Sequence, residues 1–158
     1  MVDQVTRNIL DAHIQNAKKL VSEYGFTVTG VISTPPFSYT SGFTEEDCSE
    51  FIMAGMEHEI AHAIFTSLYR LVSDGVEINS GDELDGLLGD GYKLSVIDID
   101  PRNSGMSVTR ALYPEFKSAA VFFPDVNHLF PWDDGVEPII KEIQTMTLLK
   151  AGFTGASH

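Results

Sequence analysis

The chain has 158 residues, of which 43% are hydrophobic, and this composition suits one compact domain with its own core over residues 1–158. Ten lysine and arginine residues stand against 23 aspartate and glutamate residues, so the formal net charge is -13. This charge repels phosphate backbones and anionic lipid heads, which argues against direct nucleic-acid binding and against a membrane surface as partner. It also permits docking on a basic protein, although most acidic small proteins are simply soluble.

Cysteine content and hydropathy bear on the location of the protein. The single Cys48 rules out an intramolecular disulfide, and no apolar run is long enough to span a bilayer. The N-terminus lacks the basic start and the apolar run of a signal peptide. We therefore expect a reducing, cytoplasmic location.

The first predicted element is a helix over residues 3–24. Asp3 can cap its start and Gly25 can end it. Apolar residues recur along it at helical spacing: Val5, Ile9, Ala12, Ala17, Leu20, Val21 and Tyr24. Three β-rich runs follow, and their short connections favour an antiparallel meander. These runs cover residues 26–32, 37–43 and 50–54.

The clearest helical pattern covers residues 57–74, where one apolar stripe precedes Gly75 and should pack on the sheet. Residues 79–91 are predicted to form a loop with one helical turn around residues 84–88. The remaining predicted elements are a strand over 92–99, a helix over 104–113, a strand over 119–123 and a helix over about 137–150. The sum is an α+β domain with a mostly antiparallel sheet of about five strands packed by helices.

The sequence His58-Glu59-Ile60-Ala61-His62 matches the zinc-peptidase pentad. On a helix the two histidines lie one turn apart, so both can bind one Zn²⁺ while Glu59 polarises its water. Helical phase argues against this interpretation. The apolar stripe is centred near Ala61, which places both histidines on its shoulder and Glu59 nearly opposite.

A zinc enzyme also needs a third protein ligand. Glu83 is a candidate, as are its neighbours Asp82 and Asp85, and nothing in the local pattern separates them. Phe65 stands where the longer metzincin pattern requires glycine. A helix whose surface happens to carry two histidines explains the same residues.

Five motifs in order resemble the domain-of-unknown-function 4262 family. They are Tyr24-Gly25-Phe26-Thr27-Val28, residues 35–43, Ser49-Glu50-Phe51-Ile52, Asp85-Gly86-Leu87-Leu88 with Gly91-Tyr92, and Phe122-Phe123-Pro124-Asp125 with Phe130-Pro131-Trp132. Phe26 replaces the family's usual tryptophan, Phe43 its leucine and Ser49 its proline. The likeness covers about residues 24–135, and the predicted C-terminal helix looks like an addition.

The resemblance implies a small α+β domain that occurs in bacteria and some phages, without an established activity. The family's Glu-x-Ala-His sequence maps onto Glu59-Ile60-Ala61-His62, so of the pentad only His58 lacks a counterpart.

Seven residues are the polar or aromatic matches to the family motifs, and we expect them to line a shared ligand-binding cleft. They are Tyr39, Thr40, Gly42, Glu50, Asp85, Asp125 and Trp132. The alternative is that Tyr39 and Trp132 are core aromatics, Gly42 a bulge and Asp125 a turn former.

The function predicted from the sequence is that of a soluble intracellular binding domain for a small polar ligand or a protein partner. A phage or bacterial defence-related role is compatible with the family's distribution, and no cofactor is expected. The alternative is a zinc-dependent hydrolase with Glu59 as base and His58, His62 and Glu83 as metal ligands. The sequence also leaves open a homodimer formed through the C-terminal helix.

Overall fold

A computed structural model describes residues 4–153 of the protein, so the predicted cap Asp3 lies outside the described residues. The α-helices are α1 (Gln4–Tyr24), α2 (His58–Ser73), α3 (Ser107–Leu112), α4 (Pro138–Glu142) and α5 (Thr145–Lys150). The strands are β1 (Thr27–Val31), β2 (Phe37–Ser41), β3 (Glu50–Ala54), β4 (Glu83–Leu84), β5 (Leu94–Ile99) and β6 (Ser118–Phe122). Two short 3-10 helices complete the list, η1 (Phe43–Glu46) and η2 (Pro101–Asn103).

The strands form one sheet in the order β1-β2-β3-β6-β5-β4. The first three strands pair with their sequence neighbours in antiparallel fashion, which confirms the predicted meander. The central pair β3 and β6 is parallel, whereas β6 with β5 and β5 with β4 are antiparallel. The protein is therefore an α+β domain with a mostly antiparallel sheet, as predicted.

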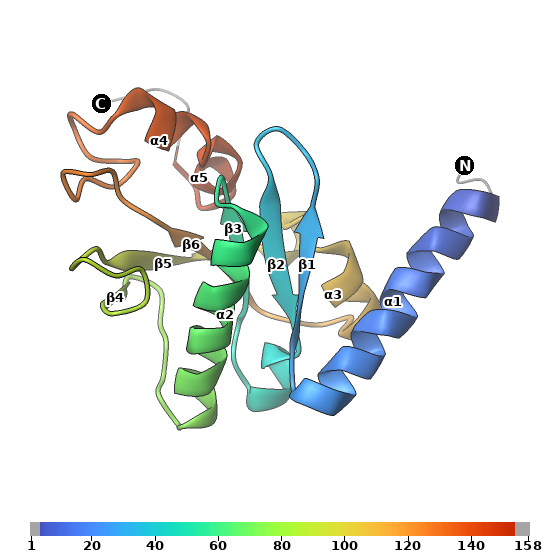
Figure 1. The fold of residues 1–158 in the computed structure, drawn as a ribbon. Coiled ribbons are helices and arrows are strands. Elements are labelled where there is room, and N and C mark those ends of the chain that lie inside the picture. Colours follow the sequence, from blue (N-terminus) through green and yellow to red (C-terminus); the bar gives the residue numbers. More distant parts are fainter. Residues whose placement is uncertain (1–3, 154–158) are drawn as a thin grey trace.

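Each face of the sheet has its own hydrophobic core, because alternate strand residues point to opposite faces. Phe51 and Met53 of β3 join the core beneath α2, whereas Ile52 joins the core that contains residues of α1, α3 and α5. In Figure 1, α2 crosses one side of the strands, and α1 extends away from the sheet at the β1 edge. The apolar stripe of α2 is buried, with Ala61, Phe65 and Leu68 fully enclosed.

Two predicted elements differ from the structure. The helical turn around residues 84–88 is wrong, because Glu83 and Leu84 are extended and pair with Ser95 and Leu94 of β5. The helix over about 137–150 is divided into α4 and α5, which are separated at Ile143 and Gln144. The side-chain amide of the buried Gln144 forms hydrogen bonds with both the N–H and the C=O of Phe123.

The C-terminal helices lie against the body of the molecule. Leu148 is only 5% exposed and belongs to the core shared with α1 and α3, and α5 contacts β3. A homodimer through this helix stays a prediction. In the part of the chain that the structure describes, no helix is long and apolar enough to cross a membrane.

Candidate functional site

The carboxylate of Glu50, at the start of β3, is buried in the turn that follows β2. It accepts hydrogen bonds of 2.6–3.2 Å from three backbone N–H groups and two hydroxyls. The N–H groups belong to Gly42, Phe43 and Thr44, and the hydroxyls to Thr40 and Thr44. Removing a carboxylate from water is costly unless such donors replace the water. The structure thus brings three of the sequence-predicted residues, Thr40, Gly42 and Glu50, together around one buried carboxylate.

Gly42 is a position where a side chain does not fit. Its φ of 121° lies in a region that L-residues avoid, and an added Cβ would lie 2.4 Å from the carbonyl oxygen of Gly25. The atoms that approach it are the chain's own, from Gly25 and Phe26.

Tyr39 of β2 is 2% exposed and belongs to the core shared with α1 and α3. Its hydroxyl accepts a hydrogen bond of 3.1 Å from the N–H of Val108. Burial raises the pKa of this hydroxyl, so Tyr39 remains a neutral partner of the α3 backbone.

The other three predicted residues lie elsewhere. Asp125 follows β6 and is buried, and its carboxylate accepts from the N–H groups of Asn127, Leu129 and Glu137. Trp132 stacks between the rings of Phe130 and Phe153. Asp85 is exposed in the loop after β4 and accepts from the N–H of Gly86. These are turn-forming and packing positions.

The pentad lies at the start of α2 with the predicted helical phase. Glu59 and His62 are exposed, and His58 is half-buried over β1 and β2, where its Nδ1 lies 2.7 Å from the Ser38 hydroxyl. Glu83 lies in β4, at the opposite end of the sheet from β1. Among residues 4–153, no group of three or more His, Cys, Asp or Glu side chains is placed to hold a metal ion.

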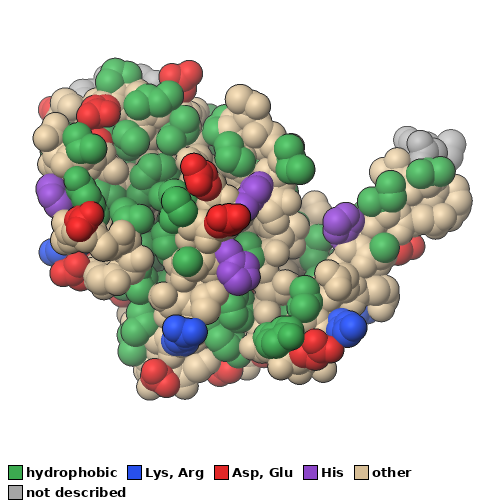
Figure 2. Space-filling view, in the orientation of Figure 1, with side chains coloured by type: hydrophobic (Ala, Val, Ile, Leu, Met, Phe, Trp, Pro, Cys, Tyr) green, Lys and Arg blue, Asp and Glu red, His purple; other side chains and the backbone are tan. Residues whose placement is uncertain are grey.

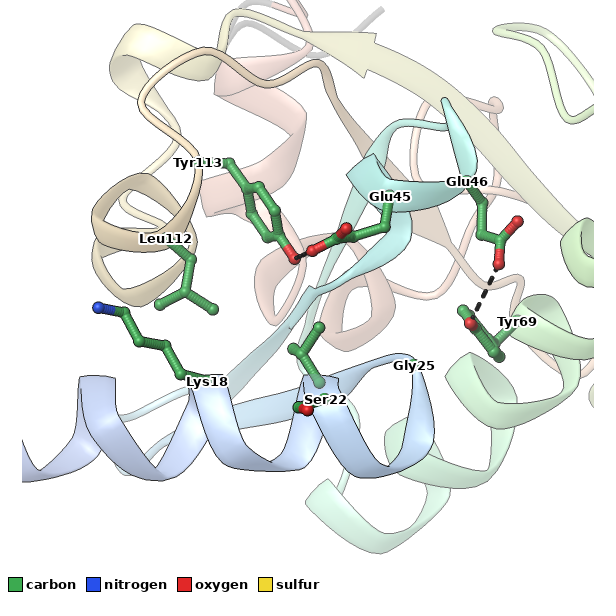
Figure 3. A pocket seen from close by; sticks show the side chains of 9 residues that line it. Lys18, Ser22, Gly25, Glu45, Glu46, Tyr69, Leu112 and Tyr113 are labelled. Atoms are coloured by element: carbon green, nitrogen blue, oxygen red, sulfur yellow. Dashed lines mark hydrogen bonds between the residues drawn. The ribbon is translucent and has the colours of Figure 1, made fainter.

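A cleft of about 540 Å³ lies where α1, η1, α2 and the end of α3 meet. Its lining residues are Lys18, Val21, Ser22, Gly25, Glu45, Glu46, Tyr69, Leu112 and Tyr113. Figure 3 shows Lys18 and Ser22 on α1, along one side of the cleft, with the Lys18 side chain extending toward Leu112, and the two glutamates of η1 on another side. Four separate segments of the chain thus supply polar groups to one hollow.

Each glutamate of the cleft is held by a tyrosine. The Tyr113 hydroxyl donates to Glu45 at 2.8 Å, and the Tyr69 hydroxyl donates to Glu46 at 3.3 Å (Figure 3). Burial and the hydrogen bond to Glu45 raise the pKa of Tyr113 well above its usual range. Burial, followed by the charge of Glu46, also raises the pKa of Tyr69. Both tyrosines therefore stay protonated and act as donors.

None of the cleft's polar residues was predicted from the sequence. Glu45 and Glu46 belong to the short connection between the predicted strands 37–43 and 50–54, and Tyr69 belongs to the predicted sheet-packing helix. The signal available in the sequence was the pair of adjacent acids that follows the Ser41-Gly42-Phe43 motif after Thr44. The nearby Cys48 is not a reactive thiol, because burial and then the charge of Glu50 raise its pKa to about 11.

A comparison with protein-family models matches residues 20–137 to one described as Domain of unknown function (DUF4262). The chain belongs to the DUF4262 family. The match confirms the family resemblance and includes Glu45, Glu46, Tyr69 and Tyr113, whereas Lys18 precedes it. The first half of α1 and the helices α4 and α5 also lie outside the DUF4262 match. Comparison with curated proteins and with solved structures gives no match.

Proposed function

We propose that this DUF4262 protein binds a small polar ligand in the cleft between α1, η1, α2 and α3. The observation that supports the proposal is the pair of carboxylates, Glu45 and Glu46, each oriented by a tyrosine hydroxyl on the wall of one hollow. A volume of about 540 Å³ is that of a small-molecule site.

The chemistry of the lining favours a ligand that carries a cationic amine. Each tyrosine engages one oxygen of its glutamate, so the carboxylates keep further acceptor positions for N–H donors. Lys18 and Ser22 on the α1 side of the cleft can bind a polar group at the other end of the ligand. The net charge of -13 attracts cations to the protein as a whole.

A matched pair of probes tests this proposal. 1,4-Diaminobutane and 1,4-butanediol have the same length, but only the diamine is charged. In ¹H–¹⁵N correlation spectra, we expect the diamine to cause saturable shifts at residues 18–25 and 44–46, and the diol to cause none. Glu45→Gln and Glu46→Gln should each weaken diamine binding by about tenfold, because each removes a charge-assisted hydrogen bond.

Glu142→Gln is the matched control, since it removes the same charge from an exposed position on α4. Equal weakening by Glu142→Gln would show that the diamine responds only to net charge. Shifts that never saturate, or that fall outside the cleft, would contradict the proposal.

The zinc-dependent hydrolase receives no comparable support, because His58, His62 and Glu83 do not come together among the described residues. We extend the binding proposal to a cytoplasmic location, where the single Cys48 stays reduced. Fractionation of the source cells followed by immunodetection tests that location.

A further inference from the structure

The first half of α1 has little of its own chain beneath it. Residues 4–13 are all exposed, and the first buried residue of the helix is Ala17. Val5 and Ile9 are 68% and 55% exposed. Figure 1 shows this half of the helix extending beyond the sheet. A helix in water gains most of its stability from packing of an apolar face, so this half lacks the contact that such a face normally makes.

The neighbouring edge of the sheet is also open. β1 is the terminal strand, and among the described residues β2 is the only strand that pairs with it. Its sequence, Thr27–Val31, contains no charge and no proline, the usual devices that protect an edge from pairing with another chain. At the other end of the sheet, β4 has only 2 residues and offers little to pair with. The long unprotected edge is thus the one beside α1.

The first half of α1 and the open edge of β1 border the same notch, which is separate from the ligand cleft. Figure 2 shows an open notch between the first half of α1 and the β1–β2 hairpin. Ile32, at the tip of that hairpin, is 95% exposed. Apolar side chains on both sides of a notch, next to unpaired strand backbone, form a surface suited to another protein segment.

The distribution of charge favours a second copy as the occupant. Residues 1–44 contain as many basic as acidic residues, so the whole net charge of -13 lies in residues 45–158. The basic residues are Arg7, Lys18 and Lys19, and the acidic ones are Asp3, Asp11 and Glu23. Two copies repel each other through their acidic bodies but not through this neutral region. A strand edge and an apolar helix face can each pair with a copy of themselves.

We propose that the chain forms a two-fold symmetric dimer through the first half of α1 and the open edge of β1. The β1 strands of the two copies pair, and the α1 of each copy covers apolar surface of the other. This interface differs from the C-terminal helix considered from the sequence, and it does not depend on the ligand cleft.

Sedimentation velocity over a protein concentration series tests the proposal on the full chain. We expect wild type to shift from monomer to dimer, and Ile9→Glu to weaken association at least about tenfold, because it would place a charge in the interface. Leu149→Glu is the matched control, since Leu149 is 53% exposed on α5. It should dimerise like wild type, and circular dichroism should show both variants folded.

Hydrogen exchange separates the strand contact from the helix contact. In wild type, the amides within Thr27–Val31 that do not bond to β2 should become protected as the dimer forms. In Ile9→Glu that protection should be lost at the same concentration. A wild type that is monomeric throughout would overturn the proposal. So would a dimer that Leu149→Glu breaks and Ile9→Glu does not, or a dimer in which β1 gains no protection.

Discussion

Two segments of this protein lie outside the DUF4262 match, and they are integrated into the fold in opposite ways. The first half of α1 is exposed along residues 4–13, whereas the C-terminal helices include the buried Gln144 and Leu148. The C-terminal segment satisfies polar backbone groups of Phe123, just beyond the end of β6, whereas residues 4–13 of α1 are exposed and cover none of the buried core. The C-terminal segment is therefore part of the packed domain, whereas the first half of α1 is the surface for which a partner is proposed above.

Gln144 shows how the C-terminal segment completes the domain. Its side-chain amide accepts from the N–H of Phe123 at 3.1 Å and donates to the Phe123 carbonyl at 2.9 Å. These are the bonds that a neighbouring strand would provide just beyond the end of β6. Asp125 adds a second anchor, because it accepts from the N–H of Glu137 directly before α4.

The largest contrast should come from equal truncations in the two segments. Leu148→Ala should lower the free energy of unfolding by about 3 kcal/mol, because it leaves a cavity in a filled core. Ile9→Ala should lower it by less than about 0.5 kcal/mol, because Ile9 is exposed. Urea denaturation at low protein concentration, where association contributes least, measures both. Similar losses would remove the distinction between the two segments.

Gln144→Leu keeps the size of the side chain but removes its polar groups. The N–H and C=O of Phe123 would be left without these partners, so we expect a loss of about 2 kcal/mol in the free energy of unfolding. The matched control is Gln15→Leu, on an exposed position of α1, with an expected change below about 0.5 kcal/mol. Urea denaturation of both variants tests this, and an unchanged Gln144→Leu would show that the sheet does not need the amide.

The smallest effect is a pH dependence at Asp125. Burial raises the pKa of this carboxyl. Hydrogen bonds from the N–H groups of Glu137, Leu129 and Asn127 together lower the pKa by more than burial raises it, so the pKa falls below its usual value. A lowered folded pKa contributes stability above the unfolded pKa of about 4, and this stability is lost as pH falls through the folded value.

The melting temperature of wild type should therefore exceed that of Asp125→Asn at neutral pH, and the gap should narrow as pH falls below about 4. Thermal melting followed by circular dichroism over a pH series measures the gap. Asp134→Asn, at an exposed position, should show no comparable gap. A gap that stays constant with pH would mean that the charge of Asp125 does not stabilise its turn.

Local patterns in the sequence predicted much of the fold. The apolar stripe and Gly75 predict where α2 lies and where it ends. Helical periodicity then places Ala61 in the core and Glu59 in solvent, because the periodicity decides which face is apolar. The parallel pairing of β3 with β6 could not be predicted in this way. The two strands are far apart in the sequence, and their register depends on how the segments between them pack.

The candidate site was harder to predict, because polarity does not distinguish a buried group from an available one. Glu50 matches a family motif, yet its carboxylate is enclosed by backbone N–H groups that no motif displays. Tyr69 and Tyr113 reach the cleft only through the packing of α2 and α3 near η1. Their pairing with Glu46 and Glu45 is therefore a property of the tertiary structure.

The tight contacts at Gly42 have a consequence for the history of the family. An added Cβ at Gly42 would lie 2.4 Å from the Gly25 carbonyl oxygen, and one at Gly25 would lie 2.0 Å from the Tyr69 hydroxyl oxygen. The motifs Tyr24-Gly25-Phe26 and Ser41-Gly42-Phe43 are thus two halves of one contact. Across DUF4262 sequences, we expect Gly25, Gly42 and Tyr69 to covary, because a side chain gained at either glycine requires a simultaneous change at the residue that it contacts.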